Sequence, residues 1–237
     1  MGTQGDEGRL KCVLVGDLAV GKTCMALSYL DDKFAKNYLP TICDNYSKQI
    51  VVDDQTYEIS VWDTAGQEEF EQLRALSYPN TSIFIICYSV VDPESFVSVE
   101  EKWVPEIKRN CPTTPFIVVG TKMDLRDDEE CLSSLADKDQ KPITTSEGQS
   151  ITDDVGGAAY VECSAYKRIN LPEVFAEAVR HAAVAQKKGR KGTSAKGGGK
   201  KKEKGTPPTS PRKKTTPADN NTDSLEKGKK GRTCIVC

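Results

Sequence analysis

The sequence predicts an α/β fold of three layers, with helices on both faces of a six-stranded, mostly parallel sheet. Three observations support this prediction. Short apolar runs that suit buried strands alternate with helical patterns, which is typical of this fold class. Asp53-Asp54 is a turn signal between two strand patterns, so the strand at one edge is expected to be antiparallel. The first 186 residues suffice for one hydrophobic core.

The expected strands are apolar or alternate between apolar and polar residues. They cover residues 10–15, 47–53, 57–63, 82–88, 115–120 and 159–162. The expected helices show the longer apolar period. They cover residues 22–31, about 68–77, 93–110, 146–155 and 171–187. The helix from residue 93 has the clearest start, because Asp92 suits the N-cap and Pro93 the first helical position.

The net charge of −2 hides two oppositely charged parts. Residues 1–186 carry 17 Lys and Arg against 31 Asp and Glu, a net charge of −14. Residues 187–237 carry 16 against 4, a net charge of +12, with almost no large apolar side chains. Such a composition cannot bury enough surface to offset its ordering entropy. We therefore expect a flexible N-terminus at 1–8, one domain at 9–186, a disordered basic tail at 187–233 and a separate motif at 234–237.

Composition also limits the class of protein. No stretch approaches the roughly 18 apolar residues of a membrane span, and the N-terminus lacks the pattern of a signal peptide. The cysteine count of nine is odd, and the single Cys-x-x-Cys pattern is the last four residues. These features predict a reducing, cytosolic environment without structural disulfides. The lone histidine, His181, falls late in a helical pattern and is expected at the surface.

A phosphate-binding loop is predicted at Gly16–Thr23, which reads GDLAVGKT and fits G-x-x-x-x-G-K-[ST]. The loop follows a strand pattern and opens a helix pattern, as the motif requires. Gly16 and Gly21 let the backbone approach a phosphate closely, and N–H groups converge on the anion at the helix start. Lys22 is expected to reach the outer phosphates and the Thr23 hydroxyl to ligate Mg²⁺.

A second segment, Trp62–Gln67, follows the strand pattern 57–61. Asp63, at the strand end, is expected to hold the Mg²⁺ shell. Gly66 can offer its N–H to a γ-phosphate, and Gln67 can orient the attacking water.

Two further segments point to a guanine base. Thr121-Lys122-Met123-Asp124 follows a strand, and the Asp124 carboxylate can accept hydrogen bonds from guanine N1–H and N2–H₂, which adenine cannot donate. Glu162-Cys163-Ser164-Ala165 follows the last strand and can close over the base. Together the four segments predict a GTPase and disfavour an ATP-dependent enzyme.

On these motifs the chain resembles a small GTPase of the Ras superfamily, with its P-loop NTPase fold, over about residues 9–185. Within the superfamily it resembles the Rho family. The segments that carry the Rho resemblance are Tyr38-Leu39-Pro40-Thr41 before Asp44-Asn45-Tyr46, Leu76-Ser77-Tyr78-Pro79, Leu125-Arg126-Asp127-Asp128, and an acidic, helix-prone stretch at about 128–139 that is similar to the Rho insert.

The resemblance implies a switch with GTP or GDP and Mg²⁺ as cofactors. Switch I would span about 34–46 and switch II about 63–78, and their order would change when the γ-phosphate is lost. The implied nucleotide-binding residues are Gly16, Asp17, Leu18, Ala19, Val20, Gly21, Lys22, Thr23, Cys24, Phe34, Tyr38, Thr41, Asp63, Gly66, Thr121, Lys122, Asp124, Leu125, Ser164, Ala165 and Tyr166. The implied magnesium ligands are Thr23, Thr41 and Asp63; the catalytic residue is Gln67; the effector residues are Tyr38, Thr41, Cys43, Asp44 and Tyr46.

Two residues depart from the Rho pattern. Leu18 stands where that pattern has Gly, and its side chain projects toward the space needed by Gln67 and by an arginine finger from an activating protein. We expect impaired stimulated hydrolysis; the alternative is that Leu18 rotates outward and is tolerated. Cys43 replaces a Phe in the effector loop, which indicates either an altered effector set or a small apolar residue that simply packs.

The chain ends Cys234-Ile235-Val236-Cys237, a C-a-a-X motif that predicts prenylation of Cys234; a metal or redox pair is disfavoured. Four cations at 227–232 would supply the second signal that a single lipid needs for an anionic membrane. Pro208-x-x-Pro211-x-Lys213 suits an SH3 groove. Thr206, Ser210 and Thr216 precede prolines and suit proline-directed phosphorylation. A plain spacer is favoured over both interpretations.

The implied partners are guanine nucleotide, exchange factors, effector proteins and a dissociation inhibitor, with no nucleic acid. Trp62 would help to select exchange factors. The implied place is the cytoplasmic face of the plasma membrane or endomembranes, with a cytosolic pool, and the implied role is actin organisation and polarity. The alternative is a largely GTP-locked adaptor that recruits partners through switch I and the tail.

Overall fold

The computed structural model describes residues 8–30, 41 and 43–193, with side chains up to residue 188. The predictions for Phe34, Tyr38, the tail from 194 and the Cys234 motif lie outside the described residues. Within these ranges, none of the helices combines the length and apolarity that crossing a bilayer needs.

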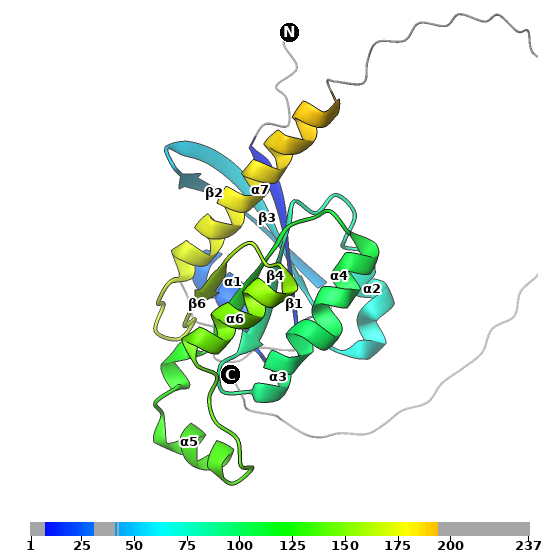
Figure 1. The fold of residues 1–237 in the computed structure, drawn as a ribbon. Helices are drawn as coiled ribbons and strands as arrows, with labels where there is room; N and C mark the ends of the chain where they lie inside the picture. The colour runs from blue at the N-terminus through cyan, green and yellow to red at the C-terminus, as the bar shows by residue number, and fades with distance from the viewer. Residues whose placement is uncertain (1–7, 31–40, 42, 194–237) are drawn as a thin grey trace, which may run out of the picture.

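The sheet has the predicted architecture (Figure 1). Its strand order is β2-β3-β1-β4-β5-β6, and β2 pairs antiparallel with β3 while the other pairs are parallel. The strands are β1 (Arg9–Gly16), β2 (Cys43–Val52), β3 (Gln55–Thr64), β4 (Ile83–Ser89), β5 (Phe116–Thr121) and β6 (Tyr160–Glu162).

Helices cover both faces of the sheet (Figure 1). They are α1 (Lys22–Leu30), the 3₁₀ turn η1 (Glu68–Phe70), α2 (Glu71–Ala75), α3 (Pro93–Ser98), the π turn η2 (Val99–Trp103), α4 (Val104–Asn110), the 3₁₀ turn η3 (Met123–Leu125), α5 (Glu129–Ala136), α6 (Thr145–Val155) and α7 (Leu171–Thr193). Asp92 caps α3 as predicted, its side chain accepting from the Ser95 N–H.

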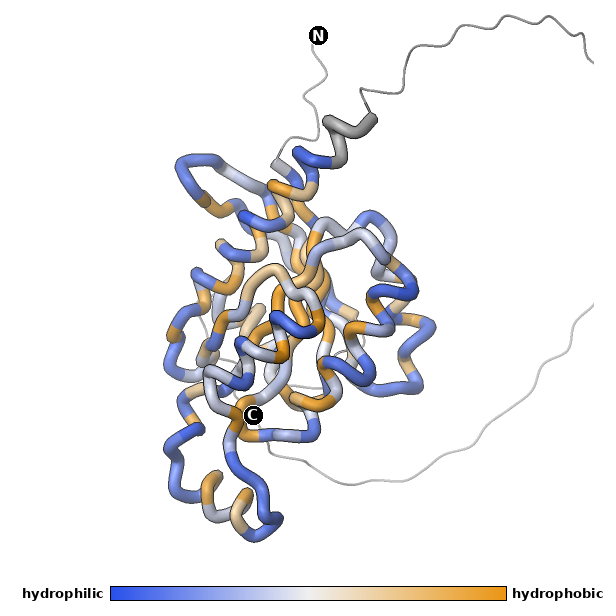
Figure 2. Tube along the Cα trace, in the orientation of Figure 1, coloured by the Kyte–Doolittle hydropathy of each residue, from blue (hydrophilic) through white to orange (hydrophobic). Residues whose placement is uncertain are grey.

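Two hydrophobic cores lie on opposite faces of the sheet because successive residues of a strand point to opposite sides. Cys12 and Leu14 of β1 pack with Phe175 of α7 in one core. Val13 and Val15 pack with Trp103 in the other. In Figure 2 the hydrophobic segments accordingly gather at the centre of the molecule, whereas the outer helices alternate between hydrophobic and hydrophilic residues. The sheet is therefore rigid, and its strand ends provide fixed positions for a site.

Several boundaries differ from the predictions. The predicted helix 93–110 contains the π turn η2, and the predicted helix 68–77 is a 3₁₀ turn followed by the short α2. β2 begins at Cys43 rather than residue 47, because it pairs with β3 as far as Thr64. α7 continues past residue 187 to Thr193, because extending an existing helix costs little.

The acidic stretch expected to be helical forms α5, which projects from the body of the molecule (Figure 1). Asp128 caps it, accepting a hydrogen bond from the Cys131 N–H.

Candidate functional site

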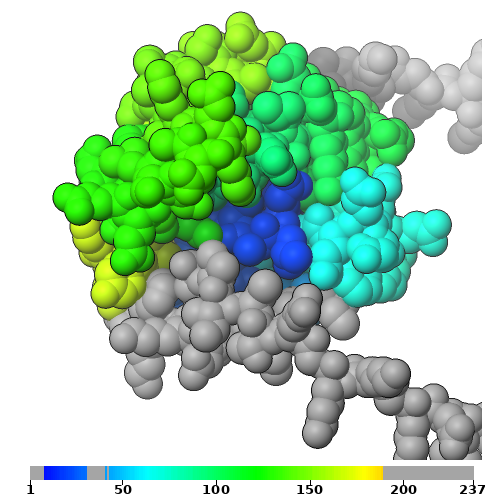
Figure 3. Space-filling view, turned by 90° about the horizontal axis from the view of Figure 1, so that it is seen from below, coloured from blue at the N-terminus to red at the C-terminus, as the bar shows by residue number. Residues whose placement is uncertain are grey.

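The carboxyl ends of β1, β3, β5 and β6 carry the predicted motifs, and in parallel strands these ends meet at one edge. Figure 3 views the molecule from that end. The phosphate loop, in blue, lies at the centre of this face, between the cyan segment after β3 and the green segments after β5. The fold thus brings together residues that are far apart in the chain.

The phosphate loop has the close-packed backbone that its glycines predict. Gly16 has a φ of +144°, and a Cβ there would lie 2.2 Å from the Cys87 carbonyl oxygen. Ala19 is also left-handed, with a φ of 63°, a sparsely populated conformation for a residue with a side chain and one that gathers at functional sites. Lys22 is buried, and its Nζ donates to the carbonyls of Gly16 (2.8 Å) and Asp17 (2.7 Å). The ammonium therefore lies inside the loop, and burial lowers the pKa of Lys22.

The three predicted magnesium ligands converge. Thr23 Oγ1 lies 3.0 Å from Thr41 Oγ1. Both hydroxyls donate to Asp63 Oδ2, that of Thr41 at 3.1 Å. The other oxygen, Asp63 Oδ1, is buried without a hydrogen-bond partner among the described residues. Burial raises the pKa of Asp63, against the opposing effects of Thr23 and Lys22. Hydroxyl and carboxylate oxygens are the ligands that Mg²⁺ prefers, so this group fits a magnesium ion.

Gly66 packs directly on the phosphate loop. A Cβ at Gly66 would lie 2.4 Å from the Asp17 carbonyl carbon and 2.5 Å from the Leu18 nitrogen, so only glycine fits. The Leu18 side chain is 52 % exposed. Gln67 is the N-cap of η1 and its side chain makes no cap hydrogen bond. The predicted water-orienting residue therefore lies at the start of η1, next in the chain to the glycine that touches the loop.

The two segments predicted to hold the guanine base, 121–124 after β5 and 162–165 at the end of β6, are called the base-side loops. The first of them contacts the phosphate loop. The Thr121 hydroxyl donates to the Val20 carbonyl and, at 2.8 Å, to the Tyr88 carbonyl, which ties the end of β5 to the phosphate loop. Lys122 is left-handed, with a φ of 57°, and a Cβ at Gly21 would lie 3.8 Å from its Cε. The Lys122 stem therefore runs beside the phosphate loop.

Other predicted residues lie around these loops. Asp124 and Leu125 fall in η3, Cys24 is half-buried on α1, Ser164 is buried and Ala165 partly buried, and Tyr166 is 61 % exposed. Three predicted effector residues lie at the start of β2. Cys43 is exposed, with its Sγ 3.4 Å from Ser77 Oγ, and the Tyr46 hydroxyl donates to Asp44 Oδ2 at 3.3 Å.

An ion pair braces the base-side loops from behind. Arg126, just after Asp124 in the chain, donates from Nη1 and Nη2 to the two oxygens of Glu162, at 2.8 and 2.6 Å. Glu162 also accepts from the Tyr160 hydroxyl (2.7 Å), which lies 2.6 Å from the Tyr88 hydroxyl. Burial would raise the pKa of Glu162, but these hydrogen bonds outweigh it and the pKa is lowered.

A comparison with protein-family models matches residues 11–184 to the family described as the Ras family. The chain belongs to the Ras family. Its members are small GTPases that bind guanine nucleotide with Mg²⁺ and switch between states, and the match covers the four segments at 16–23, 62–67, 121–124 and 162–165. GTPase activity follows from this membership, as do guanine nucleotide and regulatory proteins as general classes of partner.

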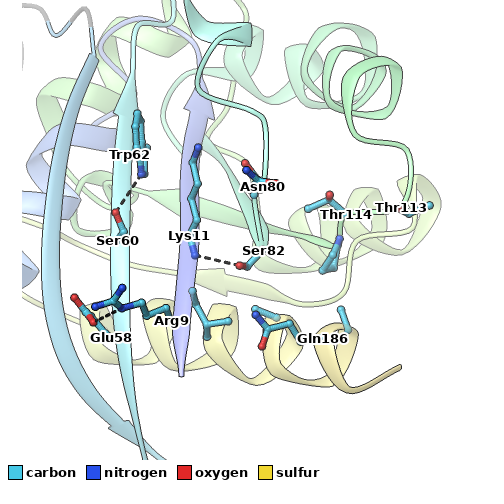
Figure 4. Close-up of a pocket in the computed structure, with 15 residues that line it drawn as sticks. Arg9, Lys11, Glu58, Ser60, Trp62, Asn80, Ser82, Thr113, Thr114 and Gln186 are labelled. Atoms are coloured by element: carbon cyan, nitrogen blue, oxygen red, sulfur yellow. Dashed lines mark hydrogen bonds and ion pairs between the residues drawn. The ribbon is translucent and has the colours of Figure 1, made fainter. Parts of the chain in front are cut away.

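A groove of about 670 Å³ lies at the opposite end of β1 (Figure 4). Arg9, Lys11 and Trp62 line it, together with Gln186 and two alanines of α7. It contains none of the predicted nucleotide-binding residues. Lys11 Nζ lies 4.1 Å from the centre of the Trp62 ring and donates to the Pro79 carbonyl at 3.0 Å, so the tryptophan is held in one orientation.

Sequence reasoning missed the residues that support the site from behind. Arg74 donates to the carbonyls of Ala65 and Gln67 and pairs with Glu106, and Lys102 donates to the Gly66 carbonyl. All three are charged residues in helical patterns, where a charged side chain usually faces solvent. The bidentate partner of Arg126 was part of a recognised segment, Glu162–Ala165, but its contact spans 36 positions and no local pattern indicates it.

Proposed function

We propose that the chain is a Rho-like member of the Ras family, a switch read by effectors through switch I and switch II. The observation that carries the proposal is the convergence of Thr41, from switch I, with Thr23 and Asp63. A switch-I hydroxyl in the magnesium cluster makes the order of that segment depend on the bound nucleotide. The helix α5, inserted between β5 and α6, supports the Rho assignment.

In this proposal each group has one role. Lys22 and the loop N–H groups bind the phosphates, and Asp124 with Lys122 holds the guanine base. Thr23, Thr41 and Asp63 would hold Mg²⁺, which neutralises phosphate charge when bound. Gln67 orients the attacking water.

We further propose that Leu18 impairs stimulated hydrolysis. Its nitrogen lies against Gly66, and Leu18 is half-exposed. In this proposal the exposed side chain obstructs the approach of an arginine finger. Such a finger is worth about 10³–10⁵ in rate, so obstruction by one side chain has a large effect.

Single-turnover GTP hydrolysis tests both proposals. The full chain and Leu18→Gly are loaded with GTP and Mg²⁺, with and without a Rho-family activating domain. Acceleration of the glycine variant alone supports obstruction by Leu18. Equal acceleration of both proteins overturns the proposed impairment but leaves the Rho-like switch. Failure of the full chain to bind GTP overturns the function as a whole.

A largely GTP-locked adaptor is the second candidate, favoured by the exposed Leu18 and the exposed Cys43 at the start of β2. The two candidates differ in turnover. An adaptor retains GTP for hours even with the activating domain and still binds effectors, whereas a cycling switch releases phosphate.

For residues 187–237 we propose a membrane address: prenylation at Cys234 and attraction of the basic tail to an anionic cytoplasmic leaflet. The domain itself would span 9–186. Exchange factors near Trp62, effectors, a dissociation inhibitor and an SH3 protein are the proposed partners, and actin organisation and polarity the role. Membrane fractionation of Cys234→Ser in cells tests the address; unchanged fractionation would contradict it.

A further inference from the structure

Three consecutive carbonyls after β3 accept hydrogen bonds from two cations. Arg74 Nη1 donates to the carbonyls of Ala65 (2.7 Å) and Gln67 (3.0 Å), and Lys102 Nζ donates to the carbonyl of Gly66 (3.4 Å) between them. In a trans peptide the C=O and the following N–H point in opposite directions. Holding these carbonyls toward the cations therefore turns the N–H groups of Gly66 and Gln67 away from them.

Both cations lie over the ring of Trp103. The ring centre is 4.8 Å from Arg74 Cζ and 4.6 Å from Lys102 Nζ. The Trp103 indole also donates to Asp17 Oδ1 of the phosphate loop at 3.0 Å. The tryptophan is fully buried, so it gives the two cations and the loop carboxylate a fixed common support.

The two cations differ in how firmly they are held. Arg74 is 2 % exposed and forms a bidentate pair with the buried Glu106, both contacts being 2.8 Å. Lys102 has a side chain that is 27 % exposed, and it is shared among the Gly66 carbonyl, Asp17 Oδ1 at 3.5 Å and Glu68 at 3.9 Å. Arg74 is therefore a fixed support, whereas Lys102 can exchange one acceptor for another.

Lys102 and Trp103 reach the same carboxylate although they are neighbours in the chain. They belong to η2, the π turn between α3 and α4. In a regular α-helix adjacent side chains diverge by about 100°, and π turns are often found at functional sites. The π turn thus accompanies an arrangement in which both side chains contact Asp17.

We propose that Lys102 is a positioning residue that couples the phosphate loop to Ala65–Gln67 and thereby raises the preference for a nucleoside triphosphate over a diphosphate. When a γ-phosphate draws the Gly66 N–H, Arg74 holds the opposite side of the same peptide, the Ala65 carbonyl. Lys102 holds the next carbonyl, that of Gly66, opposite the Gln67 N–H, and so keeps the adjoining peptide of the turn in place. Without a γ-phosphate the segment is released, and Lys102 retains Asp17 and Glu68. A contact made in one state only changes the ratio of affinities. This inference rests on the proposed function.

The test compares Lys102→Met with the matched control Lys108→Met. Lys108 lies in α4, and its Nζ donates to the Val155 carbonyl at 2.9 Å, away from the phosphate loop. Affinities of the full chain for a fluorescent GDP and for a non-hydrolysable GTP analogue are measured with Mg²⁺. For Lys102→Met we expect the ratio of triphosphate to diphosphate affinity to fall about five- to thirtyfold, with GDP affinity little changed. For Lys108→Met the ratio stays as in the parent chain.

Lys102→Arg serves as the conservative variant and is expected to restore most of the ratio. Equal losses of affinity for both nucleotides in Lys102→Met would mean a merely structural role and overturn the proposal, as would an unchanged ratio. Absence of guanine nucleotide binding by the parent chain is a different result, because it removes the proposed function before Lys102 is considered.

Discussion

The two sides of the site are supported by different kinds of contact. On the base side, Arg126 and Glu162 join the loops by a side-chain pair that is buried on the Glu162 side. On the switch side, Arg74 and Lys102 hold the backbone carbonyls of Ala65–Gln67. We expect a side-chain pair between loops that follow β5 and β6 to stay the same whichever nucleotide is bound. Carbonyls are held only while the segment lies in one conformation.

The difference teaches how one fold separates recognition from switching. The base is common to GDP and GTP, and the loops proposed to hold it follow β5 and β6 of the sheet. The γ-phosphate is found in GTP alone, and the segment that would meet it follows β3 into a short 3₁₀ turn. Changes on the base side should therefore weaken both nucleotides equally, whereas changes on the switch side should alter their ratio.

The largest expected effect comes from Gly66→Ala on the switch side. Its Cβ would lie 2.4 to 2.5 Å from backbone atoms of the phosphate loop, which cannot move aside as a flexible side chain would. We expect triphosphate affinity to fall about tenfold to a hundredfold relative to GDP affinity, from overpacking of about 1–3 kcal/mol in that conformation alone. Titration with fluorescent nucleotides measures the ratio. Equal loss for both nucleotides would remove the distinction between the two sides.

On the base side, Glu162→Gln should weaken the binding of GDP and GTP by the same factor. The variant leaves Arg126 without its carboxylate, and charge-assisted hydrogen bonds of this kind contribute about 1.5–3 kcal/mol. We expect unfolding free energy to fall by about 2 kcal/mol and both nucleotides to dissociate faster by the same factor. Glu58→Gln, which breaks an exposed pair with Arg9, should change stability by less than about 1 kcal/mol and is the control.

The same carboxylate predicts a pH dependence. The folded-state pKa of Glu162 is lowered, since its hydrogen bonds outweigh its burial. A lowered pKa contributes stability that is present above the unfolded pKa of about 4.3 and lost as pH falls through the folded value. The stability advantage of the parent chain over Glu162→Gln should thus be constant from pH 7 to about 5 and shrink below about 4.3. Denaturant unfolding with saturating GDP and Mg²⁺ measures it; an advantage that grows on acidification would contradict the sign.

Sequence reasoning reached the mostly parallel sheet and the succession of strands along the chain because the patterns that mark them are local. Apolar runs marked the strands, and Gly16–Thr23 and Asp63–Gln67 followed strand ends at recognisable spacings. The structure bears out the mixed α/β sheet, and it brings Thr23, Thr41 and Asp63 together. Their roles remain predictions.

The supporting contacts could not be predicted in the same way. Arg74 and Glu106 are 32 positions apart, and each reads alone as an ordinary charged helix residue. The π turn at Val99–Trp103 is invisible to a helical period that assumes a uniform pitch. Long-range pairing of polar groups depends on the packed fold, whereas apolar periodicity depends only on which face is buried.

Among the changes within the site, the smallest effect should come from Tyr88→Phe, which removes one hydroxyl at the far end of the base-side network. Tyr88 is fully buried, and its hydroxyl lies 2.6 Å from that of Tyr160, which still reaches Glu162 after the change. We expect a loss of about 1 kcal/mol in unfolding free energy and an unchanged ratio of GTP to GDP affinity. Tyr160→Phe removes the hydroxyl next to Glu162 and should cost more. If Tyr88→Phe altered the ratio, the network would extend from the base side into the switch side, and the separation between them would be incomplete.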